Sequence, residues 1–311
     1  MGVRHYNASQ HSDNKPGKIG LLVASGTIVD GHKPEGTIGS ESLLEQLRDV
    51  KQNKDIKALV IRIDSGGGSA FASEIIRNEI MAVRAEGIPV LISMGSVAAS
   101  GGYWIATAGD EIWAMPTTIT GSIGVFGVLP TFENSLQKIG INTDGISTTE
   151  LGGALSLERS LSPKVASIIQ SSVDHTYQSF IKLVAESRKK ELAEIDAIAQ
   201  GHVWTGNKAL EIGLVDHLGN LNEVIAAAAK RAEISNYSVK LLQQKLSPKE
   251  EFIRALAGKN VQGLIPKSLL SPYAELSVLK QFSPILKPLL ELQNMNDPQK
   301  VYASCLDCIT P

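Results

Sequence analysis

The sequence predicts an α/β fold built on a parallel sheet. Over the first hundred residues, short apolar segments rich in β-branched residues alternate with segments of helical periodicity. This alternation is typical of parallel strands joined by right-handed helical crossovers. Two of the predicted strands run into glycine-rich stretches, at 64–69 and 95–102, and each stretch opens a helix. Because ligand sites in open α/β sheets lie at the carboxyl ends of the strands, we expect both stretches at one crevice.

Each predicted element follows from its own pattern. The strands are the buried apolar runs, at 19–24, 56–63, 89–94, 111–114 and 121–128. The helices show apolar residues at helical spacing or are rich in alanine, at 40–52, 72–86, 103–108, 132–139, 164–186, 192–199, 208–211 and 221–232. Ser40 stands where it could cap the first helix, with Leu43, Leu44 and Leu47 facing the core. The helix 164–186 is long and periodic, and we expect it on the surface, where it could dock on a neighbour.

The chain of 311 residues divides into three predicted parts. Residues 1–17 are polar and lack the apolar core of a signal peptide, so we expect a flexible lead-in. Residues 18–233 hold the α/β domain. Residues 234–311 carry many leucines, lysines and prolines. They predict a helical C-terminal tail of short amphipathic pieces that packs on the domain, on a partner subunit or on a membrane surface.

Composition excludes several classes of function. The 43% hydrophobic and 20% charged residues are ordinary for a globular protein, and a net charge of −2 gives no indication of nucleic-acid binding. No apolar run approaches the length that spans a bilayer. The glycine-rich stretches match neither the dinucleotide fingerprint nor the phosphate-binding loop, so we expect no cofactor.

The two cysteines, Cys305 and Cys308, form a lone Cys-x-x-Cys close to the C-terminus. A zinc site needs more ligands than one such pair, so we expect no complete metal site. A local disulfide, a partial metal site and two unpaired thiols all stay open, and export from the cytoplasm would favour the disulfide.

Ser100 is the candidate nucleophile. It lies between alanines and glycines where the third strand passes into a helix. The first N–H groups of a helix are unpaired and carry partial positive charge, which suits an oxyanion beside a serine. We predict the oxyanion donors at the N–H groups of Gly68 and Gly101, with Gly67 as the alternative to Gly68. The competing interpretation is that these small residues only allow tight helix packing.

A serine needs a base to take its proton, and no histidine offers an obvious pairing. Of the six histidines, only His202 lies in a structured motif, the Gly-His-Val-Trp turn. The sequence therefore gives little support to a Ser-His mechanism.

Three motifs together resemble signal peptide peptidase A (protease IV), a family of serine proteases with a fold like that of Clp proteases and crotonases. They are Asp-Ser-Gly-Gly-Gly-Ser at 64–69, Ala-Ala-Ser-Gly-Gly-Tyr-Trp at 98–104 and Thr-Gly-Ser-Ile-Gly-Val at 120–125. The resemblance continues through 200–206 and 213–216 to Asn-Asp-Pro-Gln at 296–299. It is strongest to the C-terminal repeat of the long, two-repeat form of Gram-negative bacteria.

The resemblance implies a Ser–Lys dyad that degrades cleaved, apolar signal peptides. In the single-repeat members the lysine precedes a Ser-Pro, which here is Ser162-Pro163, and the matching position is about Gly152. In the two-repeat form the lysine lies in the first repeat and the serine in the second. This chain therefore resembles the half that carries the serine, and the lysine would come from a missing repeat or a partner. Gly66 is a further departure, because the family usually has proline there.

The resemblance also implies a homo-oligomer, or a complex with a lysine-bearing repeat, on the periplasmic side of the bacterial inner membrane. The membrane anchor would come from a missing part or from a partner. Two alternatives stay open. The chain could be a non-catalytic subunit or fragment without its base, or, less favoured, an enzyme like the acyl-CoA hydratases.

Overall fold

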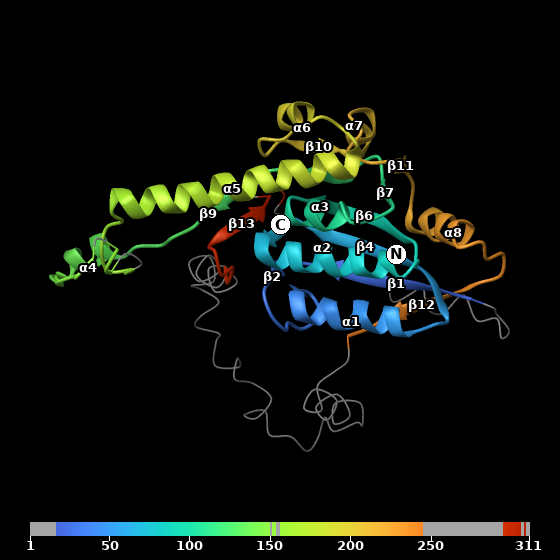
Figure 1. The fold of residues 1–311 in the computed structure, drawn as a ribbon, viewed down its shortest axis with the longest axis horizontal. Coiled ribbons are helices and arrows are strands. Elements are labelled where there is room, and N and C mark those ends of the chain that lie inside the picture. Colours follow the sequence, from blue (N-terminus) through green and yellow to red (C-terminus); the bar gives the residue numbers. More distant parts are fainter. Residues whose placement is uncertain (1–16, 150, 154–155, 245–294, 306–307, 309–311) are drawn as a thin grey trace, which may run out of the picture. The chain divides into compact units, whose positions relative to one another are not determined.

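The computed structural model describes residues 17–149, 151–153, 156–244, 295–305 and 308 (Figure 1). A main unit comprises residues 1–242 and 296–311. A second unit, 243–295, lies almost entirely outside the described residues. The predicted lead-in at 1–17 lies outside them as well, apart from Gly17.

The main sheet holds eight strands, and most of its pairs are parallel. The path runs β10 (Val203–Thr205), β8 (Ile119–Gly121), β6 (Val90–Ala99), β4 (Ile56–Ser65), β1 (Lys18–Ser25) and β12 (Ser238–Leu242), with β7 (Glu111–Ala114) beside β6 and β11 (His217–Leu218) beside β7. Only β10 runs antiparallel to its neighbour in this sheet. The predicted α/β class with parallel strands is confirmed.

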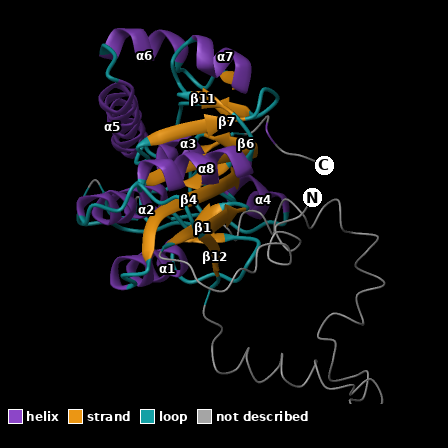
Figure 2. Cartoon of the chain, turned by 90° about the vertical axis from the view of Figure 1, so that its right-hand side faces the viewer, coloured by secondary structure: helices purple, strands orange, loops and turns teal. Residues whose placement is uncertain are grey.

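Helices cover both faces of this sheet (Figure 2). The helices of the described residues are α1 (Ser40–Gln52), α2 (Ala70–Ala85), α3 (Gly101–Ala106), α4 (Glu133–Lys138), α5 (Pro163–Arg188), α6 (Leu192–Ile198), α7 (Gly206–Glu211) and α8 (Leu221–Arg231). Of these, α4 buries no residue and lies away from the sheet (Figure 1). Side chains alternate between the faces of a strand. In β4, Leu59 and Ile61 pack with α1, α2 and α3, whereas Ala58 and Val60 pack with α8. Burial on both faces explains why these strands are continuous apolar runs.

A second sheet lies at the carboxyl ends of the main strands. Its order is β3 (Ile38–Gly39), β2 (Ile28–Val29), β5 (Gly67–Ser69), β13 (Val301–Ser304) and β9 (Phe126–Gly127). The strands are short and come from distant parts of the chain, and β13 runs antiparallel to both of its neighbours. This small sheet brings the C-terminal residues beside the glycine-rich stretch of 66–69.

Three local predictions were wrong, each for a physical reason. Gly39, not Ser40, is the N-cap of α1, because the Ser40 hydroxyl bonds to the Gly31 N–H and to Asp30 instead. The segment 121–128 holds the last residue of β8 and the whole of β9, because Ser122 takes a positive φ of 48° that ends the first strand.

The third error concerns β6, which runs on to Ala99 rather than stopping at Gly95. The pairing of β4 with β6 shifts between Ile63 and Ser65, where a bulge accommodates extra residues of β6. At Gly95 a β carbon would lie 2.6 Å from the Cγ atom of Asp64. Glycine is required there because the Asp64 side chain fills its space.

The stretch predicted as a helical tail contains strands where it is described. β12 pairs in parallel with β1, and β13 lies in the second sheet. A strand edge leaves unpaired backbone groups that a further strand can satisfy, and both segments add to such an edge. The amphipathic pieces predicted at 264–290 lie outside the described residues.

Candidate active site

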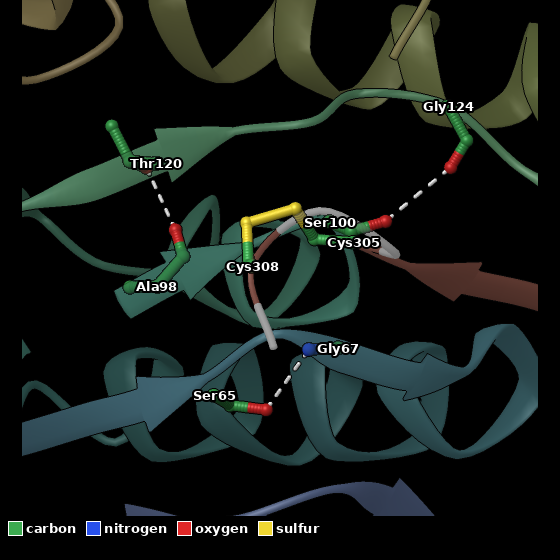
Figure 3. Close-up of a disulfide and its surroundings, with 8 residues drawn as sticks. All are labelled: Ser65, Gly67, Ala98, Ser100, Thr120, Gly124, Cys305 and Cys308. Atoms are coloured by element: carbon green, nitrogen blue, oxygen red, sulfur yellow. Dashed lines mark hydrogen bonds between the residues drawn. A yellow bond between two sulfur atoms is a disulfide. The ribbon is translucent and has the colours of Figure 1, made fainter. Parts of the chain in front are cut away.

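Ser100 lies at the turn between β6 and α3 in an uncommon backbone conformation. Its φ is 54° and its ψ is −115°, a region that L residues rarely adopt and that tends to mark functional sites. The Ser100 N–H donates to the carbonyl of Gly121 at 2.8 Å, and the Ser100 carbonyl accepts from Trp104 at 2.8 Å. The hydroxyl donates to the carbonyl of Gly124 at 3.4 Å (Figure 3). Backbone bonds on both sides therefore hold this turn.

The glycines that follow Ser100 are needed for close packing. A β carbon at Gly101 would lie 2.7 Å from the Ser73 hydroxyl, and one at Gly102 would lie 2.9 Å from the carbonyl of Ser65. Tight packing and a serine with positive φ therefore coexist at this turn. The packing interpretation explains the glycines but not the backbone strain at Ser100.

The two glycine-rich strand ends meet, as the sequence predicts. A β carbon at Gly67 would lie 2.7 Å from the Gly101 nitrogen. Ser65 fixes the first strand end, because its hydroxyl donates to the carbonyl of Gly26 at 2.6 Å and accepts from the Gly67 N–H at 3.1 Å. The Gly67 N–H therefore already has an acceptor, the Ser65 hydroxyl. Gly68 lies opposite Ala303 of β13.

The C-terminal segment covers this crevice. The Cys305 N–H donates to the carbonyl of Gly66 at 2.7 Å, and Cys305 and Cys308 form a disulfide. The two cysteines pack against Val97 and Ala99, just before the serine. Figure 3 shows the disulfide close to Ser100. Ser100 is only 1% exposed in this arrangement. Of the three alternatives for the cysteines, the structure shows the disulfide.

A cavity of about 390 Å³ opens beside the carbonyl that Ser100 contacts. Ser122, Gly124, Tyr177 and Cys305 are among its lining residues. Burial, followed by a hydrogen bond with Asp196, raises the pKa of Tyr177 to about 12. Tyr177 therefore stays neutral and offers no base to the serine at ordinary pH.

In the structure, the His202 ring makes its contacts with Ala199 and Trp204. One ring nitrogen bonds to the carbonyl of Ala199 at 2.7 Å, and the ring stacks on Trp204. This agrees with the low weight that the sequence gives to a Ser-His mechanism.

Gly152, the position expected to correspond to the lysine of single-repeat proteins, lies in an exposed loop. A β carbon there would meet the side chain of Ser147, which is also exposed. Among the described residues, no cluster of His, Cys, Asp and Glu could hold a metal ion, and no helix of the described part is long and apolar enough to cross a membrane.

Two residues that position the site were not singled out from the sequence. The Asp64 carboxylate accepts from the Val97 N–H at 3.0 Å and fills the bulge of β6. Asp297 is fully buried and joins β13 to the N-terminus of α2. The resemblance included both in its motifs, but only the fold shows what they contact.

A serine held with positive φ at a strand-to-helix turn, beside glycines of a neighbouring strand end, is the arrangement of an α/β serine hydrolase. Comparison with known proteins gives the family. The model of peptidase family S49 matches residues 82–235. The chain belongs to this family, the protease IV family of serine-type peptidases.

The relatives show how much of the family's length the chain covers. It is 42% identical over 299 residues to Protease 4 of Salmonella typhi. This match covers 94% of this chain and 47% of that protein. It is 33% identical to a protein named as a protease in Synechocystis sp. (strain ATCC 27184 / PCC 6803 / Kazusa), covering 79% of this chain and 84% of that protein. The chain spans about half the length of the curated Protease 4 relatives.

Among solved structures, a ClpP1 variant of Listeria monocytogenes is 15% identical, with a TM-score of 0.44 over 66% of this chain and 94% of that chain.

Proposed function

We propose that this chain supplies the nucleophile of a serine endopeptidase that degrades cleaved, apolar signal peptides. The observation that carries the proposal is the strained turn at Ser100 beside the junction of Gly67 and Gly101. In this proposal Ser100 attacks the peptide carbonyl, and the N–H groups of Gly68 and Gly101 hold the oxyanion. Gly67 shapes the close approach between the two strand ends.

The reaction follows acyl-transfer chemistry. A neutral lysine takes the Ser100 proton as the Oγ–carbon bond forms, and the negative charge moves to the carbonyl oxygen. The tetrahedral intermediate then expels the amine, which receives the proton from the lysine ammonium. Water hydrolyses the resulting ester by the same proton path. The lysine acts as a base only when burial or nearby positive charge lowers its pKa towards neutrality.

We infer that this lysine comes from another repeat or another chain. The absence of lysine from the sequence of 148–155, the segment that the resemblance matches, supports this, and so does the coverage of only about half of the two Protease 4 relatives. The cavity beside Gly124 offers room through which such a side chain could reach the serine hydroxyl. The working enzyme is then a homo-oligomer or a complex with a lysine-bearing repeat. We place it on the periplasmic side of the bacterial inner membrane.

A second candidate is a non-catalytic subunit. The burial of Ser100 favours it, because a serine that is 1% exposed does not meet a peptide in this conformation. A serine-reactive fluorophosphonate separates the two candidates when the adduct is read by intact mass.

The experiment compares the chain alone with the chain mixed with a lysine-bearing repeat. The proposal predicts one adduct at Ser100 in the mixture, and its loss in Ser100→Ala. Ser96→Ala is the matched control, because Ser96 is an exposed serine of the same strand. Peptide hydrolysis that persists in Ser100→Ala would contradict the proposal.

A further inference from the structure

The helices α2 and α3 begin at the two glycine-rich strand ends and lie side by side (Figure 1). α2 begins just after Gly68, with Ser69 as its N-cap. α3 begins at Gly101, directly after Ser100. The N–H groups to which we assign the oxyanion therefore lie near the starts of two neighbouring helices. A shift of α3 along α2 would change the distance between these donors and would move the serine with it.

Trp104 ties α3 to α2 through a hydrogen bond. Its indole N–H donates to a carboxylate oxygen of Glu74, on α2, at 2.7 Å. Its backbone N–H donates to the carbonyl of Ser100 at 2.8 Å and closes the first turn of α3. Because α3 has only six residues and no side-chain cap, the contacts of its side chains decide where it lies. One residue thus connects the turn of the candidate nucleophile to the helix that follows the other strand end.

The surroundings of Trp104 hold this hydrogen bond in place. Trp104 is 3% exposed, and its ring packs on the fully buried Phe180 of α5, with 4.5 Å between the ring centroids. A buried indole N–H needs an acceptor, because leaving it unpaired costs free energy. On the other side, the Nε atom of Arg77 lies 3.4 Å from the same oxygen of Glu74. The ring packing therefore restricts the donor, and the arginine restricts the acceptor.

A second contact places the start of α3. A β carbon at Gly101 would lie 2.7 Å from the hydroxyl of Ser73, so the α3 backbone lies directly against this side chain. The Ser73 hydroxyl donates to the carbonyl of Ser69 at 2.8 Å and is thereby fixed on α2. Gly101 and Trp104 are three residues apart and so lie on one face of α3. Ser73 limits the approach of the helices at one end of this face, and Glu74 holds the other end.

We infer that Glu74 is a positioning residue, which fixes α3 on α2 through the Trp104 indole. The spacing between the Ser100 hydroxyl and the two oxyanion donors then depends on this hydrogen bond. The inference rests on the proposed function of Ser100. The Glu74 carboxylate acts through Trp104 and not on the substrate. Its effect is on geometry, and a misplacement of about 1 Å can cost about 100-fold in rate.

Three variants change the hydrogen bond in different ways. Glu74→Ala removes the acceptor, Glu74→Gln keeps an oxygen acceptor of the same reach, and Trp104→Phe keeps an aromatic ring but removes the donor. Glu79→Ala is the matched control. Glu79 is a glutamate of the same helix, and it forms an ion pair at 2.6 Å with Lys51 of α1, so its loss affects the packing of α2 on α1. Urea unfolding gives the stability of each variant.

The readouts are the rate of fluorophosphonate addition at Ser100 and the kcat and KM for a peptide, on the chain mixed with a lysine-bearing repeat. Glu74→Ala is expected to lower the addition rate and kcat by about tenfold or more and to change KM by less than about twofold, because the loss is one of geometry in the transition state. Trp104→Phe should have the same effect. The double variant should be no slower than either single variant, because both changes remove one bond.

The control variants separate positioning from stability. Glu74→Gln is expected to recover the rate to within about threefold of the unchanged chain, since its amide oxygen can accept from the indole. Glu79→Ala should keep the rate within about twofold, whatever it costs in stability. Equal addition rates in Glu74→Ala and Glu79→Ala would overturn the inference. A folded Glu74→Gln variant as slow as Glu74→Ala would overturn it as well. Should Trp104→Phe fail to fold, the Glu74 variants decide.

Failure of the proposed function looks different. In that case the unchanged chain forms no adduct at Ser100, even with a lysine-bearing repeat present. Amide hydrogen exchange of the chain alone then decides whether Glu74 positions α3. Exchange in 101–106 is expected to be faster in Glu74→Ala than in Glu79→Ala, and to return to the rate of the unchanged chain in Glu74→Gln. Exchange in 101–106 that Glu74→Ala leaves unchanged would overturn the inference.

Discussion

The Asp64 carboxylate accepts a hydrogen bond from the Val97 N–H at 3.0 Å, across the irregular pairing of β4 with β6. Val97 is buried, so its N–H would lose its partner without Asp64. Ser100 follows Val97 by three residues, at the turn after β6. The position of the candidate nucleophile thus depends on a carboxylate of the neighbouring strand.

Asp64→Ala is expected to lower the free energy of unfolding by about 1–3 kcal/mol, the usual cost of an unsatisfied buried amide. Asp64→Asn keeps an oxygen acceptor of the same reach and should recover most of this loss. Urea unfolding of the three proteins measures the difference. Equal stability of the alanine and asparagine variants would show that the hydrogen bond contributes little.

The backbone strain at Ser100 predicts an unusual stability order. Residues held in rare φ/ψ regions cost about 1–3 kcal/mol, and glycine adopts a φ of 54° without that cost. Ser100→Gly is therefore expected to be more stable than Ser100→Ala by about 1 kcal/mol, after the larger chain entropy of unfolded glycine is subtracted. Neither variant should react with a fluorophosphonate. Thermal or urea unfolding gives the order, and a glycine variant less stable than the alanine variant would contradict the strain.

Two adjacent glycines of the 66–68 stretch should respond differently to a methyl group. At Gly66 a β carbon would meet nothing closer than 3.8 Å, and its φ is not positive. At Gly67 the φ is 101° and the carbonyl of Ala303 stands in the way. Gly66→Ala should change the free energy of unfolding by less than about 0.5 kcal/mol, whereas Gly67→Ala should cost more than about 2 kcal/mol. Urea unfolding of the two variants tests this difference, and each variant is the control for the other.

The main sheet could be predicted from the sequence because its signal is local. β1, β4 and the first half of β6 are continuous apolar runs, and α1, α2 and α8 show helical spacing or alanine-rich runs. Both glycine-rich stretches could be assigned to one crevice for the same reason, since parallel strands end at the same edge of a sheet. The turn at Ser100 followed from its small neighbours.

The rest depended on contacts between distant residues. β13 has only four residues, and its partners lie more than 170 positions away along the chain. Its strand character comes from the edge that it completes, so no pattern in 301–304 could indicate it. The bulge at Gly95 is similar, because the side chain that requires glycine there belongs to Asp64, on another strand. Short strands and bulges of this kind are set by tertiary packing rather than by propensity.

The ion pair of Arg188 with Asp216 predicts a pH dependence of stability. Burial alone would raise the pKa of Asp216, but hydrogen bonds from Arg188 and from the Ile112 N–H outweigh it and lower this pKa below the ordinary 3.8. A carboxyl group with a lowered pKa in the folded state stabilises the protein above its unfolded pKa, and the contribution is lost as the pH falls through the folded value. The free energy of unfolding should therefore decrease as the pH falls below about 4. Asp216→Asn should remove that part of the decrease while lowering stability at neutral pH. Urea unfolding between neutral and acid pH compares the two proteins, and parallel pH profiles would show that Asp216 is not the group responsible.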